Sequence, residues 1–143
     1  MDIVMKQEYT ILIAVRNPHI RAFLKREMRR KGYHILLAST GHEVLKWVFG
    51  KEPLHLLIID PDFPDVGRSQ ILKELRDRIP PLPTIIHSFS IDNDILSNTS
   101  DHIIFVEKGG GSIERLKQVS VELLKKLRPE RPDCNETGSK SKR

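Results

Sequence analysis

The sequence predicts an α/β fold in which five parallel strands form a doubly wound sheet with helices on both faces. Three observations lead to this prediction. Short apolar runs alternate with segments of helical periodicity along the whole chain. The connections between them are short, so consecutive elements pack as right-handed crossovers. One apolar run, 54–59, lacks the alternation of a half-exposed strand, as expected for a central strand that is covered on both faces.

The five predicted strands are short runs rich in Ile, Leu and Val, residues that suit buried strands. They span 11–15, 34–38, 54–59, 84–87 and 103–106.

The predicted helices follow these strands and carry recognisable start and stop signals. Asn17 and Pro18 can cap and begin the first helix, and Gly32 can end it. Ser39 or Thr40 can cap the second helix, and Ser112 the last one. Helical spacing marks three inner faces: Val44, Leu45 and Val48; Ile71, Leu72 and Leu75; Ile113, Leu116, Leu123 and Leu127. Residues 90–100 contain few helix formers, so we expect the fourth helix to be short or frayed.

Length and composition favour one globular domain of 8–128 between an N-terminal extension, 1–7, and a disordered polar tail, 129–143. No apolar run approaches the ~20 residues of a membrane span, and the N-terminus lacks a signal-peptide pattern. The single cysteine, Cys134, argues against disulfides and the histidines show no zinc-ligand spacing. We therefore expect a cytoplasmic protein.

Polar residues end four of the predicted strands, at Arg16, Asp60, Ser88 and Lys108. Ligands of open α/β sheets bind beyond the carboxyl ends of the strands. An aspartate, a hydroxyl and a lysine are thus expected to meet at one edge of the sheet. A nucleotide or flavin site is disfavoured because the first strand is followed by Arg-Asn-Pro-His and not by a glycine-rich phosphate loop.

This arrangement resembles the receiver domain of two-component response regulators, a flavodoxin-like fold, over about 8–128. The segment Leu-Leu-Ile-Ile-Asp-Pro-Asp-Phe-Pro-Asp-Val-Gly, 56–67, is similar to the family's segment around the phosphorylated aspartate. The resemblance implies that Asp60 stands at the phosphoacceptor position, Ser88 and Lys108 at the phosphoryl-contact positions, and Phe105 at the aromatic switch position. The alternatives are structural roles: a loop anchor for Asp60, a core hydroxyl for Ser88 and plain packing for Phe105.

Two departures from the family pattern affect the expected chemistry. The family ends its first strand in two acidic residues that hold magnesium, and this chain has Val15 and Arg16 there. Magnesium needs carboxylate oxygens, so we expect its binding to be lost and no cofactor to be used. Our hypothesis places the Arg16 guanidinium in the vacated position, paired with Asp60; the alternative is that Arg16 points into solvent. The family's proline after the lysine is replaced by Gly109, so we expect a rearranged loop with trans peptide bonds.

The first predicted helix concentrates the positive charge of the chain. The formal net charge is +5, yet 16–31 alone carries seven cations against Glu27, a net +6. The exposed row contains Arg21, Lys25, Arg26, Arg29 and Arg30. It can be a solvated face, a docking surface for an acidic protein partner, or a nucleic-acid contact. The last is ranked low because no recognition helix and no aromatic stacking surface accompany the charge.

The sequence therefore predicts a single-domain, degenerate receiver, or pseudo-receiver: a protein-interaction module of phosphorelay signalling and not an enzyme. Its expected partner is a histidine kinase, a phosphotransfer domain or another signalling protein, with no membrane contact. The first alternative is a receiver that is phosphorylated on Asp60 by a metal-independent route. The second is nucleic-acid binding through the basic helix. The sequence leaves the oligomeric state open.

Overall fold

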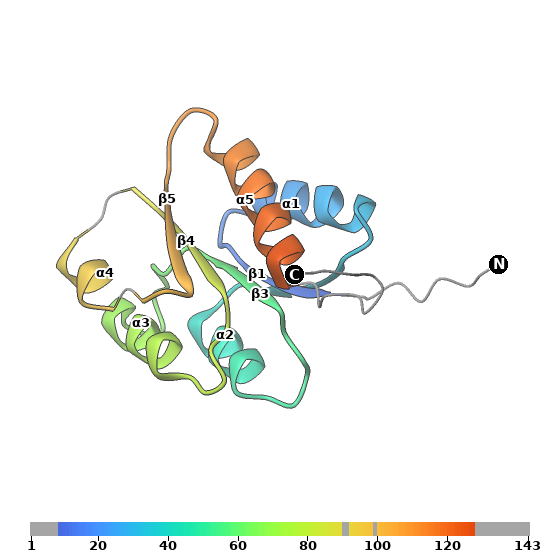
Figure 1. Ribbon diagram of the computed structural model, residues 1–143. Coiled ribbons are helices and arrows are strands. Elements are labelled where there is room, and N and C mark those ends of the chain that lie inside the picture. Colours follow the sequence, from blue (N-terminus) through green and yellow to red (C-terminus); the bar gives the residue numbers. More distant parts are fainter. Residues whose placement is uncertain (1–8, 90–91, 99, 128–143) are drawn as a thin grey trace, which may run out of the picture.

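The computed structural model describes residues 9–89, 92–98 and 100–127, and it confirms the predicted fold class (Figure 1). All five strands are parallel, in the order β2-β1-β3-β4-β5. Their bounds are β1 Thr10–Ala14, β2 His34–Ala38, β3 Leu56–Ile59, β4 Thr84–Ser88 and β5 Ile103–Glu107. Strand order reverses direction next to β1, so the carboxyl ends of β1 and β3 are adjacent at the edge where ligands bind in such sheets.

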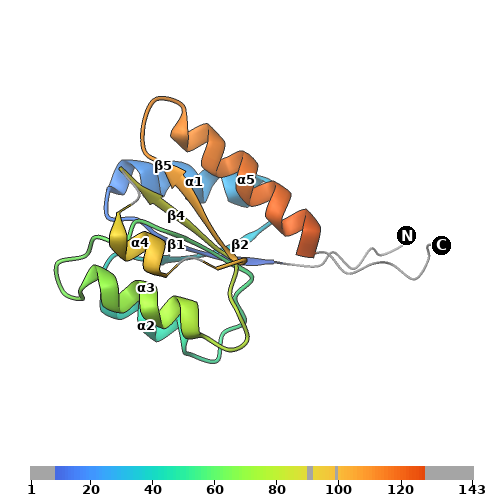
Figure 2. The same cartoon turned by 60° about the vertical axis from the view of Figure 1, so that its left-hand side comes forward.

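Five helices cover the sheet. They are α1 Pro18–Arg30, α2 Gly41–Val48, α3 Arg68–Asp77, α4 Asn93–Ser97 and α5 Ser112–Leu127. The helices α1 and α5 lie together on one face, α2 and α3 lie on the other, and α4 lies beside α3 (Figures 1 and 2). None of the helices within the described residues is long and apolar enough to cross a membrane.

Two apolar cores, one on each face, hold these layers together. Along β3, Leu56 and Ile58 belong to the core under α1 and α5, whereas Leu57 and Ile59 belong to the core under α2 and α3. All four side chains are fully buried. The absence of alternation in this run is therefore explained by burial on both faces.

The helix starts follow the predicted capping in two of three cases. The Asn17 side chain accepts hydrogen bonds from the amides of His19 and Ile20. Thr40, and not Ser39, caps α2, because its hydroxyl accepts from the Glu43 amide while the Glu43 carboxylate accepts from the Ser39 amide. The two bonds resemble a capping box, except that the carboxylate accepts from the residue before the cap and not from the cap itself. Ser112 is the first residue of α5 and not its cap, and its hydroxyl bonds elsewhere.

Several element bounds differ by one or two residues from the sequence prediction. The strand β1 ends at Ala14, β3 begins at Leu56, and β4 and β5 continue to Ser88 and Glu107. The expectation of a short fourth helix is confirmed, since α4 has five residues. The predicted N-terminal extension, 1–7, and the predicted polar tail, 129–143, lie outside the described residues.

Candidate functional site

Asp60 and Lys108 meet at the carboxyl edge of the sheet, as the sequence predicts. Asp60 follows β3 directly, and its amide donates to the Ala14 carbonyl at 3.1 Å. Lys108 follows β5, and its Nζ forms an ion pair with Asp60 Oδ2. The Lys108 amide donates to the Ser88 carbonyl at 2.7 Å, which fixes the lysine backbone against the end of β4. Both side chains are mostly covered, with 14% of Asp60 and 22% of Lys108 exposed.

Ser88 is buried at the end of β4, but its hydroxyl has a partner that the sequence did not suggest. Arg68 Nη2 donates to Ser88 Oγ at 3.1 Å, and Arg68 Nη1 pairs with Asp62 Oδ1 at 3.0 Å. The same Nη2 lies 3.6 Å from Asp92 Oδ2, before α4. A sequence signal did exist: Arg68 is the first residue of α3, where a cation is unfavourable beside the helix dipole unless carboxylates compensate for it.

The two degenerate metal positions have different surroundings. Val15 is 3% exposed and packs in the core under α1 and α5, so it supplies no ligand to the site. Arg16 is exposed, and its Nη1 donates to the Asp62 carbonyl at 3.3 Å. The predicted pair between Arg16 and Asp60 is wrong, because Lys108 is the cation that pairs with Asp60. The alternative, that Arg16 points into solvent, is also wrong, because its guanidinium contacts the loop after β3.

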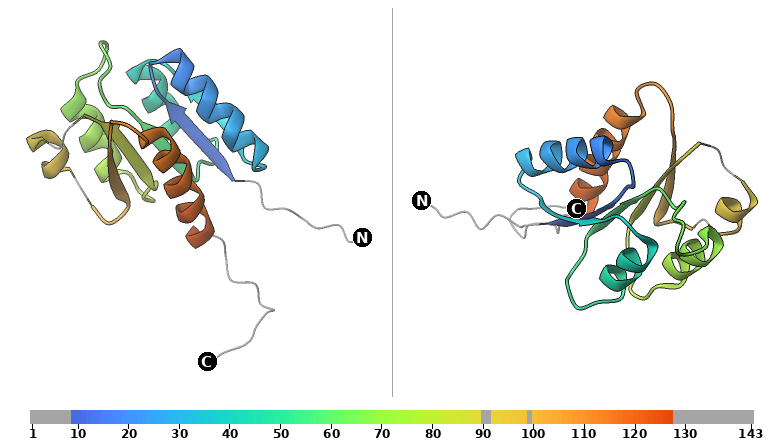
Figure 3. Two further views of the ribbon diagram at one scale, coloured as in Figure 1. Left: turned by 90° about the horizontal axis from the view of Figure 1, so that it is seen from above. Right: turned by 180° about the vertical axis from the view of Figure 1, so that it is seen from behind.

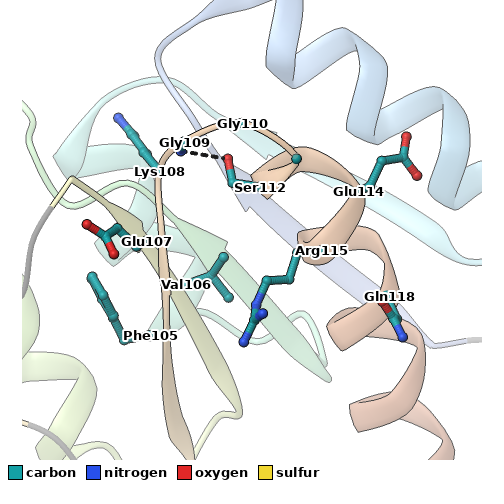
Figure 4. A pocket seen from close by; sticks show the side chains of 11 residues that line it. Phe105, Val106, Glu107, Lys108, Gly109, Gly110, Ser112, Glu114, Arg115 and Gln118 are labelled. Atoms are coloured by element: carbon teal, nitrogen blue, oxygen red, sulfur yellow. Dashed lines mark hydrogen bonds between the residues drawn. The ribbon is translucent and has the colours of Figure 1, made fainter.

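The loop that follows Lys108 is held by a buried polar contact. His87 Nε2 lies 3.0 Å from Ser112 Oγ. This hydroxyl also accepts from the Gly109 amide at 3.2 Å (Figure 4). Burial lowers the pKa of His87, the nearby Lys108 charge lowers it further, and Asp60 acts in the opposite direction. The peptide bonds of this loop are trans, as predicted, and Gly111 adopts a positive φ of 80° that favours glycine.

Phe105 lies on β5, two residues before the strand ends. Its ring is partly buried and packs against the core under α2 and α3. Figure 4 shows Phe105 and Glu107 on one side of the strand and Val106 on the side of α5. A hollow of about 700 Å³ runs along this strand and the glycine loop, and Asp60 and Ser88 do not line it. Phe89, 73% exposed, is the aromatic ring that lies next to Lys108, with Nζ 4.9 Å from the ring centroid.

The basic residues of α1 separate into two groups. Arg21 donates to the carbonyls of Val15 at 2.8 Å and Arg16 at 3.2 Å, so its guanidinium braces the end of β1 and does not belong to the open face. The other four cations line a hollow of about 370 Å³ together with Ala22: Lys25, Arg26, Arg29 and Arg30. Glu27 is the carboxylate beside them, and a hydrogen bond from Lys117 of α5 lowers its pKa.

Comparisons with known proteins agree with this geometry. No family model matches the sequence. The chain is similar to response regulator RR06 of Streptococcus pneumoniae serotype 2 (strain D39), with 31% identity over 91 residues. This match covers 64% of the chain and 41% of RR06, so the chain spans about two fifths of the length of this curated relative.

Two solved structures have both a similar fold and detectable sequence similarity. One is the crystal structure of histidine kinase ThkA in complex with response regulator TrrA, in which the matched chain is 27% identical with a TM-score of 0.67. That match covers 81% of this chain and 98% of the other. The other is TrrA from Thermotoga maritima in complex with Mg²⁺-BeF, which is 25% identical with a TM-score of 0.63, over 80% and 98% of the two chains. The chain therefore has the fold of CheY-like receiver domains and is similar in sequence to response regulators over part of its length.

Proposed function

We propose that this receiver is a pseudo-receiver, which acts in two-component signalling by binding a protein partner without needing phosphorylation. The observation that carries the proposal is the replacement of the metal-binding acids by a buried Val15 and by Arg16. The remaining carboxylates already have cations of the chain itself as partners: Asp60 has Lys108, and Asp62 has Arg68. The site is thus neutralised by its own side chains.

The residues at this site do not fit a magnesium ion. Magnesium requires near-octahedral oxygen ligands at short distance, usually with at least one or two carboxylates. The Asp62 carbonyl receives a hydrogen bond from Arg16, and a guanidinium beside that carbonyl repels a divalent cation. Within the described residues, no group of three or more His, Cys, Asp or Glu side chains could hold a metal ion. Metal-assisted phosphoryl transfer to Asp60 is therefore not part of the proposal.

Magnesium titration by isothermal calorimetry tests the lost metal site directly. We expect no heat of binding for the wild type at millimolar Mg²⁺. The double variant Val15→Asp, Arg16→Asp should gain measurable affinity, because it supplies two carboxylates beside Asp60. The matched control, Val15→Asn with Arg16→Gln, removes the guanidinium without adding a carboxylate. It should show no heat of Mg²⁺ binding. Wild-type binding at micromolar affinity would overturn the proposal.

A second candidate function is favoured by one specific observation. Asp60, Lys108 and Ser88 are together at the site, and Lys108 is the cation that a phosphoryl group on Asp60 would meet first. This arrangement supports a receiver that accepts a phosphoryl group without metal. Detection of a phosphoryl adduct on Asp60 in metal-free solution would favour this candidate over the pseudo-receiver.

The protein partner would bind through the basic stripe of α1, which consists of Lys25, Arg26, Arg29 and Arg30. Glu27 lies 3.7 Å from Arg26 and 3.5 Å from Arg30, so one carboxylate compensates for only part of the charge of these four cations. The remaining positive charge favours a carboxylate-rich partner, since Arg forms bidentate pairs with carboxylates. The ThkA–TrrA complex, in which a response regulator is bound to a histidine kinase, supports a signalling protein as this partner.

A further inference from the structure

The helix α4 is held at both ends by arginines of α3. Arg68, at the start of α3, reaches Asp92, whose Oδ1 caps α4 by accepting from the Ile95 amide at 3.1 Å. Arg76, eight residues later on α3, donates from Nη1 to the carbonyl of Ser97, the last residue of α4, at 3.3 Å. The two helices lie side by side in every view (Figures 2 and 3).

This attachment matters because α4 has little stability of its own. Five residues are far fewer than the ~12–15 that an isolated helix needs, and Asn and Ser are poor helix formers. Ile95 is its buried anchor, at 1% exposure, whereas Leu96 is 60% exposed. The position of α4 therefore depends on Ile95, on the Asp92 cap and on the two arginines.

One guanidinium joins three separate segments at this point. Arg68 contacts Asp62 in the loop after β3, Ser88 at the end of β4, and Asp92 before α4. The side chain is 20% exposed, so these contacts are partly shielded from water. A planar guanidinium can bind three groups at once, whereas the ammonium of lysine acts as a point charge.

We infer that Arg68 and Arg76 form a pair of internal straps that fix α4 and the Ser88 hydroxyl in one arrangement. This inference rests on the proposed phosphorylation-independent function, since it explains what holds the receiver in a single state. Arg68 binds Ser88, Asp62 and Asp92 from inside the chain, so neither a metal nor a phosphoryl group is needed to bring these segments together. Arg68 is a positioning residue in this scheme.

The test is amide hydrogen exchange at Ile95, Leu96 and Asn98, measured by NMR. Arg68→Met combined with Arg76→Met should accelerate exchange at these amides by at least tenfold, with each single variant in between. Arg68→Lys should behave like Arg68→Met, because a point charge cannot bind all three segments. Asp92→Asn keeps a good N-cap and removes the carboxylate, so it should reproduce the Arg68 effect alone.

The matched control is Lys73→Met, which removes an exposed cation from the same helix between the two straps. We expect no change in α4 exchange for this variant, and no change in the β3 amides for any variant. The inference is overturned if the double variant exchanges within twofold of the wild type, or if Lys73→Met has the same effect. Incubation of the wild type with acetyl phosphate tests the proposed function separately, because an adduct on Asp60 would overturn it. The exchange data test only whether Arg68 and Arg76 fix α4.

Discussion

At the scale of single residues, the site combines contacts that the sequence predicted with others that it could not. The expectation that Asp60, Ser88 and Lys108 lie at one edge of the sheet is confirmed, because each ends a strand or directly follows one, and parallel strands end at one edge. Arg68 was missed because its contacts depend on the path of one long side chain across three segments. The pairing of Arg16 with Asp60 was wrong for the same reason: strand order brings Lys108 near Asp60, but only side-chain geometry decides which cation reaches the carboxylate.

The lowered pKa of His87 predicts that the free energy of unfolding depends on pH. Burial lowers its pKa below the 6.5 of the unfolded chain. As pH falls below about 6.5, the unfolded state takes up a proton that the folded state rejects, so the free energy of unfolding decreases until the folded pKa is reached. We expect urea unfolding to show wild-type stability falling between pH 7 and pH 5.5, by at most about 1.4 kcal/mol per pH unit for each such histidine.

The variant His87→Gln should flatten this pH dependence, because its amide has no proton to gain. His55 also has a pKa lowered by burial, and its Nδ1 accepts from the Thr10 amide, so His55→Gln should remove a second share of the slope. The double variant should show the weakest pH dependence of the free energy of unfolding among the four proteins. Equal slopes in all four proteins would show that neither histidine stays neutral in the folded state.

At the scale of elements, the loop between β3 and α3 is fastened to the start of α2. Asp65 accepts hydrogen bonds from the amides of Gly41 and His42, both at 2.9 Å, and these bonds lower its pKa. Val66 packs directly over Gly41. The sequence predicted both helices from apolar spacing, but the contact between them required the fold, since 24 residues separate Gly41 from Asp65.

This close approach predicts the effect of adding one methyl group. A Cβ at position 41 would lie 2.8 Å from Val66 Cβ and Cγ2, and 3.2 Å from Asp65 Oδ1. We expect Gly41→Ala to lower the free energy of unfolding by about 1–3 kcal/mol, as overpacking does in other cores. Gly110→Ala is the matched control, because nothing lies within 4 Å of its Cβ position, and it should not lower the free energy of unfolding. Equal effects in urea titrations would contradict this explanation.

At the scale of the whole molecule, positive charge and site chemistry occupy different surfaces. The site lies at the carboxyl edge of the sheet, whereas the basic stripe lies on α1, where Arg26, Arg29 and Arg30 are exposed. The layers and the parallel sheet followed from the alternation of strands and helices, which is why the fold class could be predicted from the sequence. The separation of Arg21 from the stripe could not, because it depends on which backbone carbonyls the guanidinium reaches.

The stripe predicts a preference for carboxylates that charge reversal should abolish. We expect a labelled polyglutamate peptide to bind the wild type, with affinity that falls as salt rises, in fluorescence anisotropy titrations. Arg26→Glu with Arg29→Glu should weaken binding at least tenfold. Lys125→Glu with Lys126→Glu, an equal change of charge on exposed residues of α5, should weaken it by less than threefold. Tighter binding of duplex DNA than of the peptide, lost in the α1 variant, would favour the nucleic-acid alternative.

The proposed pseudo-receiver has a site that is neutralised by its own side chains and does not use phosphorylation. Intact-mass spectrometry after incubation with acetyl phosphate tests it most directly, with and without Mg²⁺ and beside an Asp60→Asn control. We predict an unchanged mass for the wild type under both conditions. A phosphoryl adduct that forms on the wild type and disappears in Asp60→Asn would contradict the claim, and would mean that Lys108 and the arginines of the site support phosphoryl transfer.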